Sequence, residues 1–162
     1  MSNGAMPKIH RYEVSVKWTG NLGSGTSDYR SYSRRFELST GTDKPIIPGS
    51  ADHAFRGDRD RWNPEELLVA SLAACHKLWY LHLCATAGVV VVDYVDRAEG
   101  FMEEADDGSG CFERVILRPE VIVAPGSDLA KARELHRLAH EKCFIANSVN
   151  FTVEHEPEIK VQ

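Results

Sequence analysis

Two of the four cysteines lie in segments that would let their thiols meet. Cys75 lies in the middle of a long apolar stretch, and Cys143 lies far along the chain, near the end of a second helix-like stretch. In a reducing compartment, a pair of thiols more often serves redox or metal chemistry than a structural bridge. Packing is the alternative for Cys75, because cysteine is among the most buried residue types. We expect simple packing for Cys84 and Cys111.

A metal site is the second chemistry that these residues suggest. His136, His140 and Cys143 recur at i, i+4 and i+7, on one face of a helix and within reach of one zinc ion, and Cys75 would be a fourth ligand. No CxxC or HExxH pair accompanies them, and an amphipathic helix with several histidines gives such a triple easily. Charged residues at 133, 134 and 137 indicate that His136 lies on a solvated face. We therefore expect no metal.

The helix that carries Cys75 has clear ends but an unusual surface. Asn63 is a suitable N-cap, Pro64 suits the first helical position, Glu66 completes a capping box, and Gly88 suits a left-handed C-terminal cap. Between these ends the helix is apolar nearly all the way round. A helix of this kind in a globular protein must be covered on all sides. In a chain of 162 residues, a second subunit is the natural cover.

The sequence of the same helix does not favour a membrane-spanning segment. His76, Lys77 and His82 would all lie within any window that crosses a bilayer. A lysine near the bilayer centre costs about 2.5–3.5 kcal/mol on insertion scales. We expect no membrane partner.

The remaining pattern predicts an α+β fold in one domain, 1–162. Strands are expected over 10–18, 29–38 and 44–50, a charged loop over 52–62, a second hairpin with arms 89–104 and 111–124, a helix over 129–143, and a last strand over 148–161. Hairpins outnumber any βαβ pattern, so the sheets are expected to be antiparallel. Met6 suits a natural start, and we expect residues 1–6 to be disordered or left over from cloning.

Composition narrows the classes of partner. The chain is 43% hydrophobic and 27% charged, with a formal net charge of −5. It has no dense Lys/Arg stripe, so nucleic acid is not expected as a partner. The first residues lack the apolar core of a secretory signal, and the cysteines suggest no disulfide framework. We expect a cytoplasmic protein.

Two separate motifs resemble the OsmC/Ohr family of osmotically inducible and organic hydroperoxide resistance proteins. "RWNPEELLVASLAACH", residues 61–76, is similar to the family's peroxidatic-cysteine helix, and "AHEKCFIANSVN", residues 139–150, is similar to the segment of its resolving cysteine. The expected order of elements also agrees with the family fold. Phe144 and Ile145 follow Cys143 where Ohr-type proteins tend to have C-P-Y, so the chain resembles the OsmC branch.

The resemblance implies a cysteine-based hydroperoxide reductase without metal or organic cofactor. Cys75 would be the peroxidatic thiolate, Cys143 the resolving thiol, and Glu65 the residue that orients an activating arginine. Arg56 is the nearest match to that arginine in OsmC-like members, and Arg30 is the alternative in Ohr-like ones. An external dithiol, for example a lipoylated protein, would restore the thiols.

The resemblance also implies an intertwined two-fold homodimer, in which the sheets wrap two central helices per chain. Glu65 and Cys75 lie ten residues apart, which is about 15 Å along a helix axis. An arginine paired with Glu65 would reach Cys75 of an antiparallel partner more easily than Cys75 of its own chain. The alternative function is a stress protein without peroxidase activity that binds an apolar small molecule near Trp79 and Tyr80.

Overall fold

The computed structural model describes residues 7–162, which divide into two compact units, the first ending at Pro64 and the second beginning at Glu65. The expectation for residues 1–6 lies outside the described residues, and the one-domain interpretation stays a prediction.

The first unit is built on a small antiparallel sheet. Its strands are β1 (Ser15–Trp18), β2 (Phe36–Ser39) and β3 (Ile47–Gly49), in the order β1-β2-β3. Gly49 pairs with Phe36, and a Cβ at Gly49 would lie 2.1 Å from the Phe36 ring, so this close pairing requires glycine. A short 3₁₀ helix, η1 (His53–Phe55), follows in the expected charged loop.

The strands of this unit are shorter than the sequence predicts. The first strand was expected over 10–18, but only Ser15–Trp18 pair with a neighbouring strand. The return strand begins at Phe36 rather than near residue 29. The segment before Phe36 turns instead, since the Arg34 guanidinium donates hydrogen bonds to the carbonyls of Tyr29 and Tyr32. Residues 10–14 lie outside the β1–β2 pairing, which begins at Ser15.

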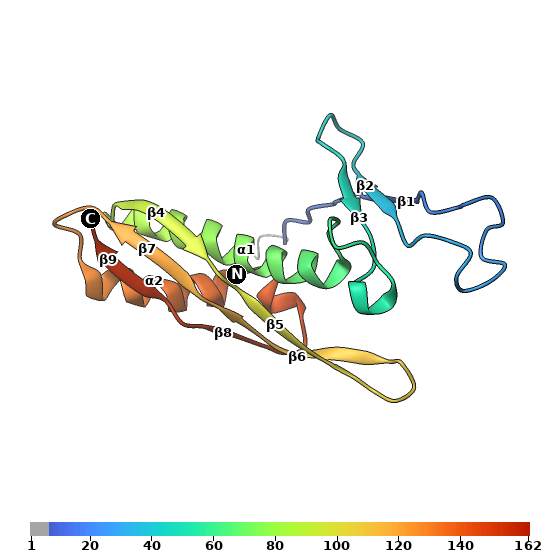
Figure 1. The fold of residues 1–162 in the computed structure, drawn as a ribbon. Coiled ribbons are helices and arrows are strands. Elements are labelled where there is room, and N and C mark those ends of the chain that lie inside the picture. The colour runs from blue at the N-terminus through green and yellow to red at the C-terminus, as the bar shows by residue number, and fades with distance from the viewer. Residues whose placement is uncertain (1–6) are drawn as a thin grey trace, which may run out of the picture. The chain divides into compact units, whose positions relative to one another are not determined.

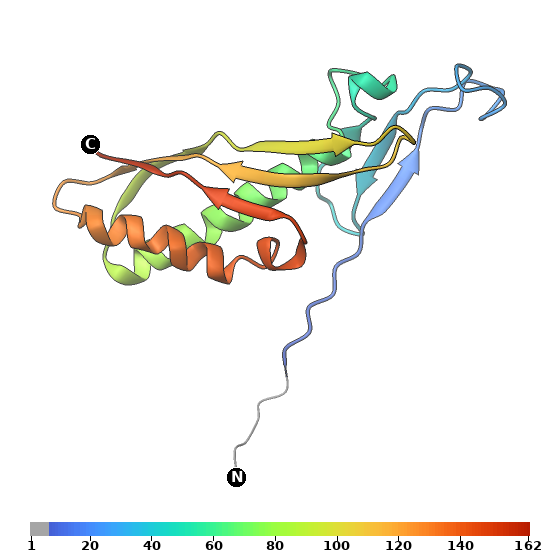
Figure 2. The same cartoon turned by 90° about the horizontal axis from the view of Figure 1, so that it is seen from below.

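The second unit contains both long helices and the larger sheets (Figure 1). Its elements are α1 (Pro64–Ala87), β4 (Val91–Asp96), β5 (Glu99–Glu104), β6 (Gly110–Leu117), β7 (Pro119–Val123), α2 (Leu129–Lys142), η2 (Ala146–Ser148), β8 (Thr152–His155) and β9 (Glu158–Val161). The strands form two sheets, β4-β7-β9 and β5-β6-β8. Both helices lie on one face of these strands (Figure 2). The α+β class is confirmed.

The sheets of this unit are mixed rather than purely antiparallel. β5 pairs with β6 and β4 pairs with β7, both antiparallel, so β4-β5 and β6-β7 are the two arms of the one hairpin that was expected. The final segment instead runs parallel to its neighbours, β8 beside β6 and β9 beside β7. The chain reaches this position through α2, which acts as the crossover helix that parallel strands need. The alternation of apolar and polar residues along a strand is the same in parallel and antiparallel pairing, so it does not predict the direction of β8 and β9.

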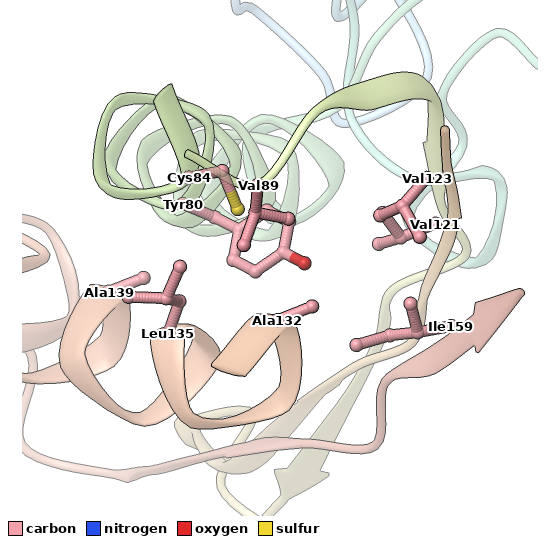
Figure 3. Packing of buried hydrophobic residues seen from close by; sticks show 9 residues of the cluster. All are labelled: Tyr80, Cys84, Val89, Val121, Val123, Ala132, Leu135, Ala139 and Ile159. Atoms are coloured by element: carbon pink, nitrogen blue, oxygen red, sulfur yellow. The ribbon is translucent and has the colours of Figure 1, made fainter. Parts of the chain in front are cut away.

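Both helix predictions are confirmed, and the helices pack on each other and on the sheet. α1 ends before Gly88, whose φ of 74° is the left-handed cap. Asp128 caps α2 by accepting a hydrogen bond from the Lys131 amide. The main core contains side chains from α1, α2, β7 and β9, and it uses alanines at 132 and 139 where α2 faces α1 (Figure 3). Small side chains let the two helices approach closely.

The surface of α1 is only partly covered within the chain. Its fully buried residues follow one stripe of i, i+4 spacing: Leu72, His76, Tyr80 and Cys84. Leu78, on another side, is 64% exposed. By length and composition α1 is apolar enough to cross a membrane, a test that core helices of globular proteins also pass. The buried side of α1 includes His76, and a buried histidine favours a helix of a protein core over a membrane-spanning helix.

Candidate active site

The structure brings the two predicted redox cysteines together. Cys75 lies midway along α1 and is partly buried, whereas Cys143 directly follows α2 and is 1% exposed. The two side chains lie close enough for Cys75 to act on the protonation of Cys143, and both are free thiols. This contact follows from the packing of α1 beside α2, which places the middle of one helix against the end of the other. The arrangement permits a disulfide between elements far apart in sequence.

The surroundings of Cys143 keep it protonated. Burial, with the Cys75 side chain as the next cause, raises the pKa of Cys143 to about 11. The Ala146 amide, which donates to Sγ at 3.4 Å, acts in the opposite direction and does not outweigh burial. At neutral pH Cys143 is therefore a protonated thiol next to Cys75. Of the two, Cys75 is the one that solvent or substrate can reach.

The other two cysteines differ from each other. Cys84 is buried in the core beside Tyr80, and burial raises the pKa of its thiol, so the packing interpretation holds. Cys111 is exposed, which contradicts that interpretation. It lies near the turn of the β5–β6 hairpin, opposite Glu103.

A buried histidine cluster lies between the helices next to the cysteine pair. His76 Nε2 and His136 Nδ1 are 3.0 Å apart, within hydrogen-bond distance, and the two rings are nearly parallel. The His155 ring, from β8, lies 5.7 Å from that of His76 and 5.5 Å from that of His140. Tyr80 stacks on His136 with ring centroids 3.7 Å apart.

The position of His136 contradicts the expected solvated face, because its side chain is 0% exposed. The charged neighbours suggested exposure, but His136 shares the apolar face of α2 with Ala132, Leu135 and Ala139. The helical spacing of His136 with these three apolar residues is the feature of the sequence that indicates its burial. Within residues 7–162, no group of three or more His, Cys, Asp or Glu side chains is arranged to hold one metal ion.

Burial keeps the central histidine pair neutral. It lowers the pKa of His76 to about 4 and that of His136 to about 3, and the neighbouring histidines act in the same direction. His76 Nδ1 and His136 Nε2 are buried without a hydrogen-bond partner among the described residues. Each ring therefore uses one nitrogen to bond the other across the helix interface.

This pair predicts a marked acid sensitivity. Between pH 6.5 and about 4 the unfolded chain binds protons at both residues and the native state does not, so stability falls as pH falls. From pH 7 to pH 5, we expect a loss of about 2 kcal/mol per histidine in the free energy of unfolding. Urea titrations followed by circular dichroism measure it. His136→Asn should flatten this dependence and exposed His82→Asn should leave it intact; an unchanged slope in His136→Asn would contradict the assignment.

The predicted arginines lie in the first unit. Arg56 is exposed, caps η1 with a φ of 65°, and has its guanidinium carbon 5.7 Å from the Tyr29 ring. Arg30, also exposed, is the next residue after Tyr29, so the two candidates share one region of this unit. Arg34, which the sequence did not single out, stacks on Tyr29 at 4.4 Å.

Glu65 lies in the first turn of α1, in the second unit. Its Oε2 is buried and has no hydrogen-bond partner among residues 7–162. A buried carboxylate oxygen needs a donor, and a guanidinium is well suited to supply one. Which arginine serves Glu65 and Cys75 stays a prediction.

A shallow, open apolar pocket of about 260 Å³ lies one turn along α1 from Cys75 and is lined by Leu78, Trp79 and His82. The Phe144 ring, directly after Cys143, packs edge-on against Trp79. Trp79 thus lines a pocket, as the alternative function requires. Tyr80 does not line it, because Tyr80 is fully buried in the core.

Known proteins resemble this chain in both sequence and fold. The family profile described as OsmC-like protein matches residues 57–158. An OsmC-like protein of unknown function from Vibrio cholerae O1 biovar eltor is 31% identical with a TM-score of 0.84, covering 93% of this chain and 100% of that one. The uncharacterized protein YmaD of Bacillus subtilis is 24% identical over 156 residues, 94% of this chain and 95% of that protein. An organic hydroperoxide resistance protein from Elizabethkingia anophelis shares the fold, with a TM-score of 0.69 at 16% identity over 97% of this chain and 100% of that one.

Proposed function

Because this chain belongs to the OsmC-like protein family, we propose that it is a thiol-dependent peroxidase that reduces organic hydroperoxides, with hydrogen peroxide as a smaller substrate. The observation that carries the proposal is the contact between Cys75 and Cys143. An accessible thiol beside a buried, protonated one suits a two-step reaction. The choice of hydroperoxide as substrate is also supported by the relative of similar fold that is named for organic hydroperoxide resistance.

In the first step, the Cys75 thiolate attacks the distal oxygen of the hydroperoxide. The O–O bond breaks, the alkoxide takes a proton from solvent and leaves as an alcohol, and Cys75 becomes a sulfenic acid. In the second step, Cys143 attacks the sulfur of that sulfenic acid. The disulfide forms, and the thiol proton of Cys143 leaves with the sulfenic oxygen as water. An external dithiol then reduces the disulfide and is itself oxidised.

Arg56 is the proposed activating residue, with Glu65 orienting it. A guanidinium near Cys75 favours the thiolate over the thiol and donates hydrogen bonds to the peroxide oxygens. The buried Glu65 Oε2 supports this role, because it lacks a donor among the described residues. Since Glu65 and Cys75 lie about 15 Å apart along α1, the arginine that bonds Glu65 would serve Cys75 of a partner subunit.

The active form is proposed to be a homodimer. Leu78 on α1 is 64% exposed and Phe144, beside the resolving cysteine, is 70% exposed. Exposed apolar side chains next to a reactive site favour a protein interface. A second copy that covers α1 would complete the burial of this helix and close the two sites against water.

Steady-state turnover tests the proposal. The purified protein is given cumene hydroperoxide with dithiothreitol, and peroxide loss is followed over time. We expect catalytic consumption, with a Cys75–Cys143 disulfide detected by mass spectrometry when the dithiol is left out. If Cys75 stays unoxidised at equimolar hydroperoxide, the peroxidase proposal is wrong.

Cys143→Ser should separate the two steps. This variant should react once with hydroperoxide and then turn over at least about tenfold more slowly, because its sulfenic acid has no resolving thiol and climbs to sulfinic acid. Mass spectrometry should show one and then two added oxygens on Cys75. A mixed disulfide to Cys84 or Cys111 in the wild-type protein would show that the resolving residue is misassigned.

A second candidate function is supported by the pocket at Leu78, Trp79 and His82. In this alternative, the protein binds an apolar small molecule and Cys75 does not react. Quenching of tryptophan fluorescence by an apolar ligand, together with an inert Cys75, would favour binding over peroxidase activity. Ligand quenching that is lost in Trp79→Ala would locate the site.

A further inference from the structure

The cysteine pair and the histidine pair lie between the same two helices. Cys75 and His76 are consecutive on α1, His136 lies on α2, and Cys143 is the residue that caps the end of α2. The Cys75–Cys143 contact and the His76–His136 hydrogen bond therefore both connect α1 with α2. The position of α2 relative to α1 therefore sets both the histidine contact and the distance between the two thiols.

The histidine bond is well suited to this task. Both rings are at most 1% exposed, so the 3.0 Å bond forms where water does not compete. Tyr80 stacks on one face of His136 and limits its rotation. The core around this point is apolar, with Leu135 and Ala139 on the same face of α2, and the histidine pair supplies a side-chain hydrogen bond between the two helices.

Resting on the proposed redox pairing of Cys75 with Cys143, we propose that His76 and His136 are positioning residues for disulfide formation. Their hydrogen bond holds α2 at the height and distance on α1 that place the Cys143 sulfur against Cys75. They do not contact the substrate, and they act on the second step of the cycle only. Small misplacements of reacting groups slow a reaction on the order of a hundredfold, so the effect should be large.

Substitutions at His136 distinguish this role from simple packing. Asn places a polar atom the same number of bonds from Cβ as His Nδ1, the atom that bonds His76, so His136→Asn should keep the contact. Gln places its polar atoms one bond further out, and Leu has none, so His136→Gln and His136→Leu should lose it. Comparing the two amides keeps the test valid if His136→Leu fails to fold. His155→Leu, which leaves the α1–α2 bond intact, is the matched control.

The assay uses 4,4′-dithiodipyridine in a background of Cys84→Ala and Cys111→Ser, so that Cys75 and Cys143 are the remaining thiols. The Cys75 thiolate displaces one thiopyridone and forms a mixed disulfide. Cys143 then displaces the second thiopyridone, forms the Cys75–Cys143 disulfide and gives up its proton. The two releases are measured separately by absorbance. The variants are compared with a chelator present, and the wild-type protein is measured both with and without it. A wild-type second release slowed by the chelator would overturn the proposal in favour of a metal site.

We expect the first release to be the same within about threefold in all variants, as befits a role in the second step alone. The second release should stay within about threefold of wild type in His136→Asn and His155→Leu, and fall on the order of ten- to a hundredfold in His136→Gln and His136→Leu. Equal second rates in His136→Asn and His136→Gln would overturn the proposal. Because no peroxide is used, the result is independent of the proposed function, whose own failure would appear as a Cys75 inert to hydroperoxide.

Discussion

Replacing Cys75 by serine should lower the dithiol-dependent reduction of hydroperoxide on the order of a thousandfold or more. A serine hydroxyl is a far weaker nucleophile than a thiolate. The substitution is close to isosteric at a partly buried position of α1, so the fold should persist. Peroxide consumption under dithiothreitol measures the loss, and circular dichroism with size-exclusion chromatography shows that the protein remains folded.

Cys111→Ser is the matched control for this prediction. Cys111 is an exposed thiol on β6, near the turn of the β5–β6 hairpin, and it takes no part in the proposed cycle. The control should keep full activity. Full activity in Cys75→Ser would remove Cys75 from the mechanism, and with it the proposed peroxidase.

The helices and the hairpin of the second unit could be predicted because their signals are local. Pro64 and Gly88 mark the ends of α1, and the Asp-Gly pair at 107–108 marks the turn between β5 and β6. The direction of β8 and β9 could not be predicted, because a strand's alternation is the same in parallel and antiparallel pairing. The predicted strand lengths in the first unit were wrong for a related reason. A strand is paired only as far as its neighbouring strand runs beside it, and the alternation of one strand does not show where its neighbour ends.

The candidate site was predictable in part for the same reasons. Cys75 and Cys143 were identified because each lies in a motif that resembles a family segment, and the structure brings them into contact. The His76–His136 pair was missed because it joins residues sixty positions apart, and no local pattern couples them. His136 was also misjudged from its charged neighbours, which point to solvent while His136 itself lies on the buried face.

Mixing two inactive variants should restore activity if each site combines Cys75 of one subunit with Arg56 of the other. Arg56→Ala keeps Cys75, and Cys75→Ser keeps Arg56. In an equal and fully exchanged mixture, half of the dimers carry one of each, and one of their two sites receives both residues. By two-fold symmetry about a quarter of the wild-type activity should return. Because interwound chains exchange slowly, the two variants are co-expressed with different tags, and the mixed dimer is purified through both.

The purified mixed dimer makes the outcome decisive. With one working site of two, it should have about half the activity of wild type, whereas each parent variant should have close to none. If Arg56→Ala stays active by itself, Arg56 is not the activating residue, and the pairing is repeated with Arg30→Ala, the first unit's other candidate. If Arg56→Ala is inactive by itself and the mixed dimer is also inactive, each site lies within one chain. Failure of both pairings, with both arginine variants inactive alone, would place the whole site in a single subunit and contradict the composite site.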